Sequence, residues 1–268
     1  MFLEITVNPD SSLSFEEQRL VNRQLSNIIL LYLRHLPIQK VGSIRKVKIS
    51  LTDNQASYIG ILPYKKGQSA IFLVEAFDFT NYLNLTDEKE KIKRVILTIL
   101  NGVKEVAKSF DWDIFPFEDA FKSLENSRFA NELELLRRKS KDNKHFVGIN
   151  VVLNLNETIV KFIFEGINSP YRNEVEIVRI LPGEYPLNKI VGTLKWLNET
   201  DVELMCRSIE VSFIGSLNRS NIEVVYHPGL RGHTEIEIEL KILLSTIEQD
   251  TREDLLLELR KSYERFNT

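Results

Sequence analysis

The sequence is poor in the residues from which reaction centres are usually built. Its 268 residues include one cysteine and four histidines. A single cysteine excludes a disulfide within the chain and any Cys-x-x-Cys metal site. No glycine-rich phosphate loop is present, and no Gly-x-Ser-x-Gly elbow marks a hydrolase nucleophile. We therefore expect no bound cofactor, and we expect Cys206 to be a buried, inert thiol on a strand.

Long apolar runs and a strong charge of one sign are also absent. No segment approaches the ~20 apolar residues that span a bilayer, and the N-terminus lacks the basic region of a signal peptide. The formal net charge of −3 gives no broad basic field that would attract nucleic acid. We expect a cytoplasmic protein of a reducing compartment that binds neither membranes nor nucleic acid.

What the chain does contain is alternating apolar and charged secondary structure. Ser14 and Glu17 have the spacing of a capping box. Apolar residues at helical spacing follow them until Pro37 ends the helix. Two further helices are predicted, one from Thr86 to about Phe110 and one over 118–139. Strands are predicted at the N-terminus and over 41–52, 58–62 and 70–77, with a turn at 63–67.

The second half of the sequence is dominated by strand patterns. Strands are predicted over 145–155, 158–165, 174–181, 190–197, 203–215, 222–226 and 234–240, before a closing helix over 251–266. Runs of strands favour an α+β fold with largely antiparallel sheets and packed helices, helix-rich in the N-terminal half and strand-rich in the C-terminal half. The basic run 137–144 favours two domains, an α+β half over 1–143 and a mainly antiparallel half with a C-terminal helix over 144–268. The alternative, that the whole chain forms one continuous domain, stays open.

An Asp-x-Asp pair, Asp111 and Asp113, follows the second predicted helix. Two carboxylates at this spacing on an extended segment point the same way and can hold Mg²⁺, as a metal-dependent nucleotidyl or glycosyl transferase requires. No Gly-Ser phosphate-binding turn lies upstream at a matching distance. We therefore favour a structural role without metal, in which the aspartates cap the helix and Trp112 packs in the core.

A second candidate is the loop between His227 and His233, which also carries Arg231. Two imidazoles with a guanidinium between them can bind an anion, and two imidazoles can ligate a metal. The alternative is an exposed connection between strands, in which glycines supply the turn conformations. The strand that follows directs three carboxylates to one face, which suits either a basic partner or protection of a sheet edge: Glu235, Glu237 and Glu239.

The remaining histidines and Trp196 have simpler interpretations. His35 lies near a helix C-terminus, where a cation is favourable. His145 adjoins an apolar strand and has no evident partner in the sequence. We expect Trp196 in the core of a sheet.

These observations favour a non-enzymatic protein that binds another protein. One subtype is an inhibitor or immunity protein that covers the active surface of a bacterial toxin or enzyme, with acidic strips that speed association. The composition, rich in Lys, Ile, Asn and Glu, resembles that of bacterial immunity proteins, although no family motif is present. Two alternatives stay open: a metal-dependent enzyme that uses Asp111 and Asp113 or the loop 227–233, and a structural component of a larger assembly. The partner and the oligomeric state are open as well.

Overall fold

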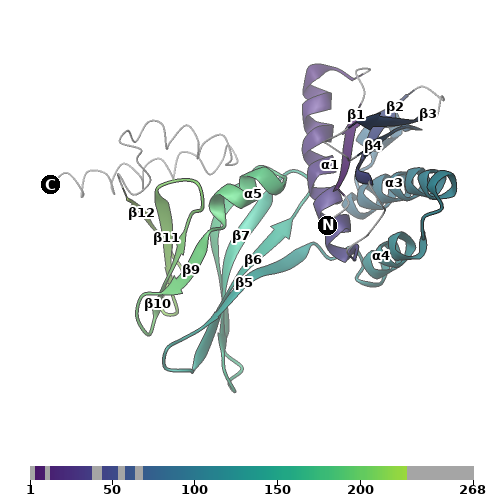
Figure 1. The fold of residues 1–268 in the computed structure, drawn as a ribbon. Helices are drawn as coiled ribbons and strands as arrows, with labels where there is room; N and C mark the ends of the chain where they lie inside the picture. The colour runs from purple at the N-terminus through teal and green to yellow at the C-terminus, as the bar shows by residue number, and fades with distance from the viewer. Residues whose placement is uncertain (1–3, 10–12, 38–43, 54–57, 64–68, 228–268) are drawn as a thin grey trace. The chain divides into compact units, whose positions relative to one another are not determined.

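The chain divides into two compact units, residues 1–130 and 131–268. The structure is a computed structural model that describes residues 4–9, 13–37, 44–53, 58–63 and 69–227 (Figure 1). Within these ranges, four helices and one sheet belong to unit 1, and two sheets with one short helix belong to unit 2. The predicted α+β class, helix-rich in the N-terminal half and strand-rich in the C-terminal half, is confirmed. The predicted boundary at 143/144 lies in a turn within unit 2.

The sheet of unit 1, here the first sheet, mixes parallel and antiparallel strands. Its members are β1 (Glu4–Pro9), β2 (Ile44–Thr52), β3 (Tyr58–Pro63) and β4 (Ser69–Ala76), in the order β1-β2-β4-β3. Strand β2 pairs in parallel with both β1 and β4, whereas β3 and β4 form the predicted antiparallel hairpin. The N-terminal β1–helix–β2 connection is therefore a βαβ unit, which needs parallel strands.

The helices of unit 1 are α1 (Phe15–His35), α2 (Phe79–Asn84), α3 (Glu88–Phe110) and α4 (Phe115–Asn126). The capping box of α1 is present, because the backbone N–H of Ser14 donates to the Glu17 carboxylate at 3.0 Å and the Ser14 hydroxyl accepts from the Glu17 N–H at 3.4 Å. Helix α3 is capped by Asp87, one residue after the predicted Thr86. The short helix α2 was not expected from the sequence. None of the described helices is long and apolar enough to cross a membrane.

Helices α1 and α3 cover one face of the first sheet, with α1 on β1 and α3 on β4, and α4 packs against α1 and α3. Their buried stripes meet the inward residues of the strands, including Ile49 and Leu73, both fully buried. Gly102 lets α3 lie close to β4, because a Cβ at this position would collide with the Leu73 side chain. The buried phenol of Tyr32 in α1 donates to the carbonyl oxygen of Phe117 at 3.0 Å, which ties α1 to α4. Burial of such side chains contributes ~1.5–3 kcal/mol each.

The predicted helix over 118–139 is wrong beyond Asn126. Arg128 and Phe129 both adopt the left-handed conformation, with φ of 54° and 56°, and an α-helix cannot pass through two such residues. The chain then extends as β5 (Glu132–Lys139). The basic residues expected at a helix C-terminus therefore lie at the end of a strand.

Over residues 131–227, unit 2 contains two antiparallel sheets joined by one short helix. The second sheet has the order β5-β6-β7-β8, with β6 (His145–Leu153), β7 (Thr158–Gly166) and β8 (Arg172–Ile180). Helix α5 (Glu184–Ile190) connects it to the third sheet, whose order is β12-β11-β10-β9. The third sheet contains β9 (Thr193–Trp196), β10 (Asp201–Met205), β11 (Val211–Ser216) and β12 (Glu223–Tyr226).

The second and third sheets pack against each other through aromatic side chains. The ring of Trp196 meets Phe164 edge-on at a centroid distance of 6.4 Å, and its indole N–H donates to the Arg138 carbonyl oxygen at 3.4 Å. Gly215 leaves room for the Phe162 ring, which a Cβ would strike at 2.6 Å. Trp196 is 8% exposed, so its predicted place in the core is confirmed.

Two strand predictions in unit 2 need correction. The segment 203–215 forms two strands, β10 and β11, because the chain turns at 206–210. The segment 190–197 begins with the last residue of α5 rather than with a strand. The predicted strand 234–240 and the closing helix 251–266 lie outside the described residues, as does most of the turn 63–67.

Gly192, between α5 and β9, is expected to be intolerant of a side chain. A Cβ here would collide with the carbonyl oxygen of Met205 and lie 2.7 Å from the backbone nitrogen of Arg207. Backbone atoms cannot move aside cheaply, so Gly192→Ala should lower the free energy of unfolding of unit 2 by about 1–3 kcal/mol. Urea unfolding followed by Trp196 fluorescence in a Trp112→Phe background measures this, since the chain has two tryptophans.

The matched control is Gly148→Ala in β6. Its Cβ would lie closest to the carboxylate oxygen of Glu134, at 3.2 Å, and that flexible side chain can rotate away, while the backbone oxygen of Leu136 at 3.5 Å is in ordinary van der Waals contact. Equal losses of stability in the two variants would contradict the assigned backbone contact at Gly192.

Candidate functional site

Of the predicted loop site between His227 and His233, only His227 lies within the described residues. Arg231, His233, Glu235, Glu237 and Glu239 lie outside them. The imidazole of His227 contacts two residues that the sequence did not connect with it. Its Nε2 atom lies 2.8 Å from the Ser212 hydroxyl and 3.5 Å from Oε1 of Glu203.

Together with Lys195, these residues form a polar cluster on one face of the third sheet, here called the Glu203 cluster (Lys195, Glu203, Ser212 and His227). The second carboxylate oxygen of Glu203, Oε2, lies 2.7 Å from Nζ of Lys195. Glu203 is 4% exposed and Ser212 is fully buried, while Lys195 reaches solvent. A buried carboxylate is therefore held by one basic side chain and by one hydroxyl, with an imidazole beside it.

Strand register brings the cluster together. Glu203 of β10 pairs directly with Lys195 of β9, so the two side chains share a face. On the other side Glu203 pairs with Ile214 of β11. Ser212 lies two residues from Ile214 and so shares that face. His227 follows the end of β12, and its backbone N–H donates to the Glu210 carbonyl oxygen at 2.8 Å.

The environment of Glu203 lowers the pKa of its carboxyl group. Burial is the largest single influence and raises the pKa. Hydrogen bonds from Lys195 and Ser212 and the positive charges of Lys195 and His227 oppose it, and together they outweigh it. Glu203 therefore remains ionised at neutral pH.

A serine, a histidine and a glutamate in contact invite comparison with a hydrolase triad, but the geometry differs. In a triad the acid holds Nδ1 of the histidine, and the serine hydroxyl donates to Nε2. Here both Ser212 and Glu203 lie at Nε2, and the Ser212 hydroxyl hydrogen-bonds to the Glu203 carboxylate. The carboxylate therefore does not hold the imidazole through Nδ1, as the acid of a triad does. Because Ser212 is also fully buried, a substrate has no access to its hydroxyl.

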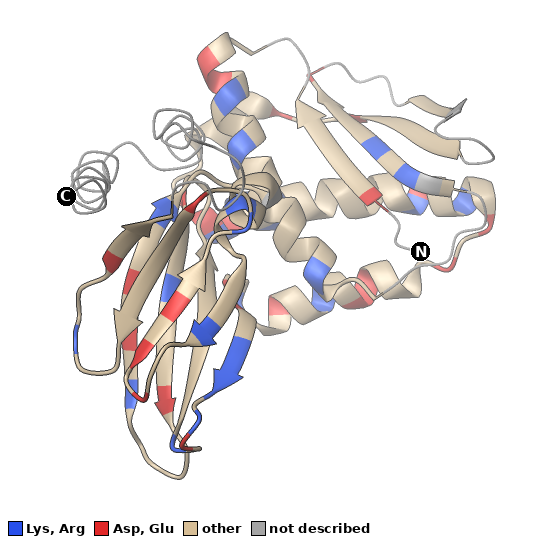
Figure 2. Cartoon of the chain, turned by 60° about the vertical axis from the view of Figure 1, so that its left-hand side comes forward, with Lys and Arg blue, Asp and Glu red and all other residues tan. Residues whose placement is uncertain are grey.

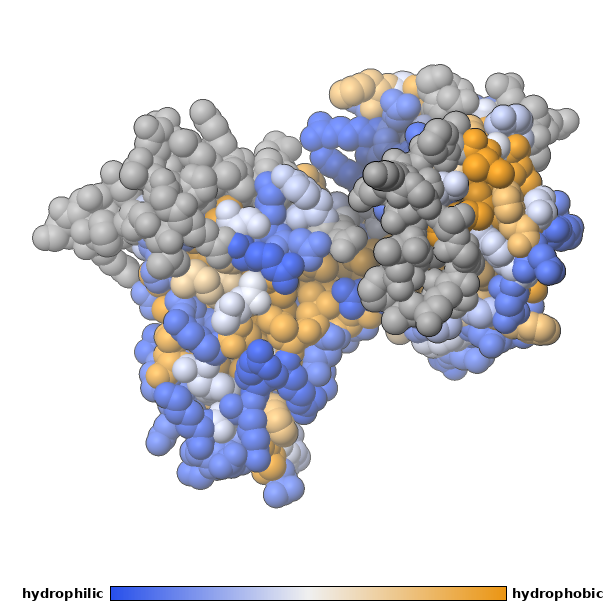
Figure 3. Space-filling model, in the orientation of Figure 1, coloured by the Kyte–Doolittle hydropathy of each residue, from blue (hydrophilic) through white to orange (hydrophobic). Residues whose placement is uncertain are grey.

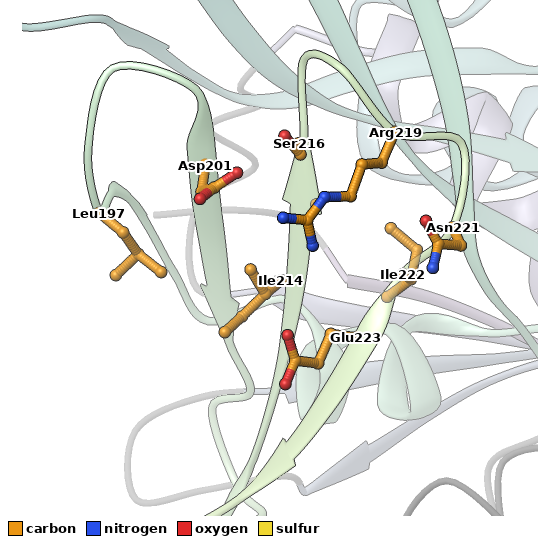
Figure 4. Close-up of a pocket in the computed structure, with 9 residues that line it drawn as sticks. Leu197, Asp201, Ile214, Ser216, Arg219, Asn221, Ile222 and Glu223 are labelled. Carbon is orange, nitrogen blue, oxygen red and sulfur yellow. The ribbon is translucent and has the colours of Figure 1, made fainter.

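Beside the cluster, the same face of the third sheet has a hollow of about 420 Å³ near the β11–β12 turn. Figure 4 shows the Arg219 side chain extending across it between Asp201 and Glu223. The Asp201 carboxylate forms a hydrogen bond within its own turn, because it accepts from the Asn198 side-chain amide at 2.8 Å. That hydrogen bond, one from Ser216 and the charge of Arg219 lower the pKa of the Asp201 carboxyl group.

Of the two aspartates predicted to cap the second helix, only Asp111 does so, while Asp113 lies at the start of α4 and Trp112 is half-buried rather than in the core. Asp111 is the C-terminal cap of α3 and adopts the left-handed conformation with φ of 53°. The carboxylate of Asp113 accepts from the Phe115 N–H at 3.0 Å, at the start of α4. Trp112 is half-buried and lies 6.1 Å from the Phe110 ring. Within the described ranges, no group of three or more His, Cys, Asp or Glu side chains is placed to hold a metal ion.

The other residues considered in the sequence analysis lie in different parts of the fold. His35 hydrogen-bonds to the Ser123 hydroxyl of α4 at 2.9 Å, and burial lowers its pKa. His145 packs edge-on against Tyr171 at a centroid distance of 5.9 Å. Cys206 is fully buried in the β10–β11 turn, as expected of a buried thiol.

A second polar surface is the solvent-facing side of the second sheet, here called the charged face (Glu134, Arg137, Lys161, Glu165, Arg172 and Glu174). Arg137 bridges Glu134 at 3.2 Å and Glu165 at 2.6 Å. Arg172 bridges Glu165 at 3.2 Å and Glu174 at 2.9 Å. Lys161 reaches Glu174 at 3.5 Å. The chain of ion pairs therefore crosses from β5 to β8, and Figure 2 shows acidic and basic residues alternating on the strands of unit 2.

Gly148 in β6 makes this span possible. It pairs directly with Arg137 on β5, and because it has no side chain the Glu134 carboxylate can lie over it. The guanidinium of Arg137 stacks on the Phe146 ring, 4.5 Å from its centroid, and so crosses β6 to reach Glu165 on β7.

The sequence did not reveal either surface. Arg137 was assigned to a helix C-terminus, and Glu203 and Ser212 were assigned to one uninterrupted strand. The signal that could have separated β10 from β11 is the polar pair Arg207 and Ser208 inside an otherwise apolar run.

No protein-family model matches the chain, and no curated protein or solved structure matches it. A function for this protein is therefore proposed from the geometry of the described residues.

The Glu203 cluster makes the stability of unit 2 depend on pH. A carboxyl group whose pKa is lowered on folding stabilises the protein above its usual pKa of 4.5. This contribution is lost as the pH falls through the lowered value. We expect Glu203→Gln to reduce the free energy of unfolding by about 1–3 kcal/mol at neutral pH, less than for a fully buried ion pair because Lys195 is solvated. Wild type and variant should converge at acidic pH.

Urea unfolding at a series of pH values, followed by Trp196 fluorescence, measures this difference. Glu199→Gln, in the exposed loop before β10, is the matched control and should follow the wild-type profile. A constant difference between Glu203→Gln and wild type at all pH values would contradict the assigned role of the ionised carboxylate.

Proposed function

We propose that the protein binds another protein through the charged face of the second sheet. The observation that carries this proposal is the continuous set of ion pairs from Glu134 to Lys161, which crosses four strands. Each of the two arginines holds two carboxylates, so the polar groups on this surface are fixed in position before any partner arrives.

Stability alone is a weak explanation for such a surface. Arg137 and Arg172 are about half exposed, and ion pairs in solvent contribute ~0–1 kcal/mol each. Recognition uses the same groups more effectively. Side chains that are already ordered lose little conformational entropy on binding, and a fixed pattern of charge speeds association and discriminates between partners.

The chemistry of the Glu203 cluster supports binding rather than catalysis at that position. The contact between Ser212 and His227 places the hydroxyl in a fully buried site beside the Glu203 carboxylate. This arrangement stiffens the third sheet, which packs behind the second sheet, and a rigid support favours a preorganised binding surface.

The sequence favours inhibition as the specific form of this binding. In this form, the protein covers the active surface of a bacterial toxin or enzyme. A charged, rigid sheet suits that role because a patterned surface of this kind gives rapid, salt-sensitive association.

The proposal is tested with the full chain as bait in a lysate of its native cell at low ionic strength. Wild type should retain a stoichiometric protein partner, and raised salt should release it. A double reversal, Arg137→Glu with Arg172→Glu, places like charges together across the face. It should weaken binding at least roughly tenfold, measured by titration with the captured partner.

The matched control reverses two exposed basic residues of unit 1, Lys122→Glu with Arg128→Glu, and should bind as wild type does. Thermal unfolding of both double variants distinguishes loss of binding from loss of folding. Failure of wild type to retain a partner, or undiminished binding by the Arg137/Arg172 variant, would refute a binding role for the charged face.

A further inference from the structure

Strand β3 is an edge strand without a charged residue. Its sequence is Tyr-Ile-Gly-Ile-Leu-Pro, and it pairs with β4 on one side only among the described strands. An edge strand directs the N–H and C=O groups of alternate residues outward, where they can pair with another strand.

The other sheet edges of the molecule differ from β3. Strand β1 carries Glu4 and ends at Pro9. Strands β5 and β8 each carry several charged residues, and each has a register irregularity in its pairing. Strands β9 and β12 have four residues each, with Lys195 and Glu223 among them. Charge, proline, irregular pairing and short length all discourage pairing between molecules, and within the described residues β3 has only its terminal proline.

Apolar side chains of β3 are exposed on both faces of the first sheet. Ile61 is 59% exposed and Tyr58 is 60% exposed. Ile61 lies on the helix-covered face of the sheet, as does Ile71, its partner on β4. Helix α3 packs on β4, and the Ile61 side chain at the sheet edge remains exposed. In Figure 3, hydrophobic side chains reach the surface over the strands of unit 1.

We propose that β3 pairs antiparallel with β3 of a second copy of this chain, which joins two first sheets into one continuous sheet. A strand without charge meets no like-charge repulsion when it faces itself, whereas the edge strands β1, β9 and β12 each carry charge of a single sign. A two-fold axis relates the copies, so the contact is closed and does not propagate into a fibre.

The pattern of side chains on β3 suits this symmetry. A register centred on Gly60 places Ile61 opposite Ile59 of the second copy, on the face where both helical layers lie. Ile61 is then covered from both sides of the axis. The Tyr58 ring lies over Gly60 on the opposite face, where a Cβ would approach the ring to 2.8 Å, and so covers the centre of the contact.

Because β3 has six residues, we expect a modest, concentration-dependent dimer rather than an obligate one. Sedimentation velocity and light scattering of the full chain over a wide range of concentrations should therefore show a monomer–dimer equilibrium. Ile61→Lys should raise the dimer dissociation constant at least roughly a hundredfold, because the two lysines lie diagonally across the axis on the same face and repel each other. The conservative variant Ile61→Val should retain the dimer.

Leu20→Lys is the matched control, since Leu20 is an exposed aliphatic residue on α1 of the same unit, and it should associate as wild type does. Thermal unfolding verifies that Ile61→Lys is folded. The double variant Arg137→Glu/Arg172→Glu should also dimerise normally, so that the charged face and β3 are tested separately. A wild-type chain that stays monomeric at high concentration, or an Ile61→Lys dimer as tight as wild type, would overturn the proposal.

Discussion

The buried carboxylate of Glu203 constrains the third sheet more strongly than any other single group. An ionised side chain can be buried only if its charge is paired and its oxygens are hydrogen-bonded. Lys195 from β9 pairs with this charge at 2.7 Å, Ser212 from β11 helps to lower the pKa of the carboxyl group, and His227 lies 3.5 Å from the same carboxylate at the end of β12. A slip of one residue at β10 would turn Glu203 toward the second sheet and Leu204 toward solvent. The cluster therefore fixes the register of a sheet whose outer strands have only four residues each.

That register in turn determines which aromatic residues meet the second sheet. With Glu203 on the outer side, Trp196 and Phe213 point inward, where both are buried. The contact between Trp196 and Phe164 then holds the two sheets of unit 2 together. The charged face lies on the far side of the second sheet from this core. Its ordered ion pairs are thus supported from behind by close-packed side chains, which is the condition for a rigid recognition surface.

Much of the architecture could be predicted from the sequence, because its signals are local. The capping box at Ser14 and the stripe of α3 need only neighbouring residues, and the alternation in β6 and β7 needs only a period of two. The failure after Asn126 has a physical origin: Leu133 and Leu136 satisfy a helical spacing as well as a strand, and no rule forecasts left-handed Arg128 and Phe129. The Glu203 cluster depends on contacts between distant residues, such as Glu203 with His227. Spacing along the chain does not contain that information, so the sequence could single out His227 but could not show which residues contact it.

Cys206 also has a practical consequence. It is the one cysteine of the chain and has no solvent exposure, and a thiolate must be accessible to react with an alkylating reagent. A cysteine introduced at any exposed position will therefore be modified selectively by a maleimide dye or spin label while the native thiol stays in place. Few chains of this length permit site-directed labelling of the folded protein without first removing a natural residue.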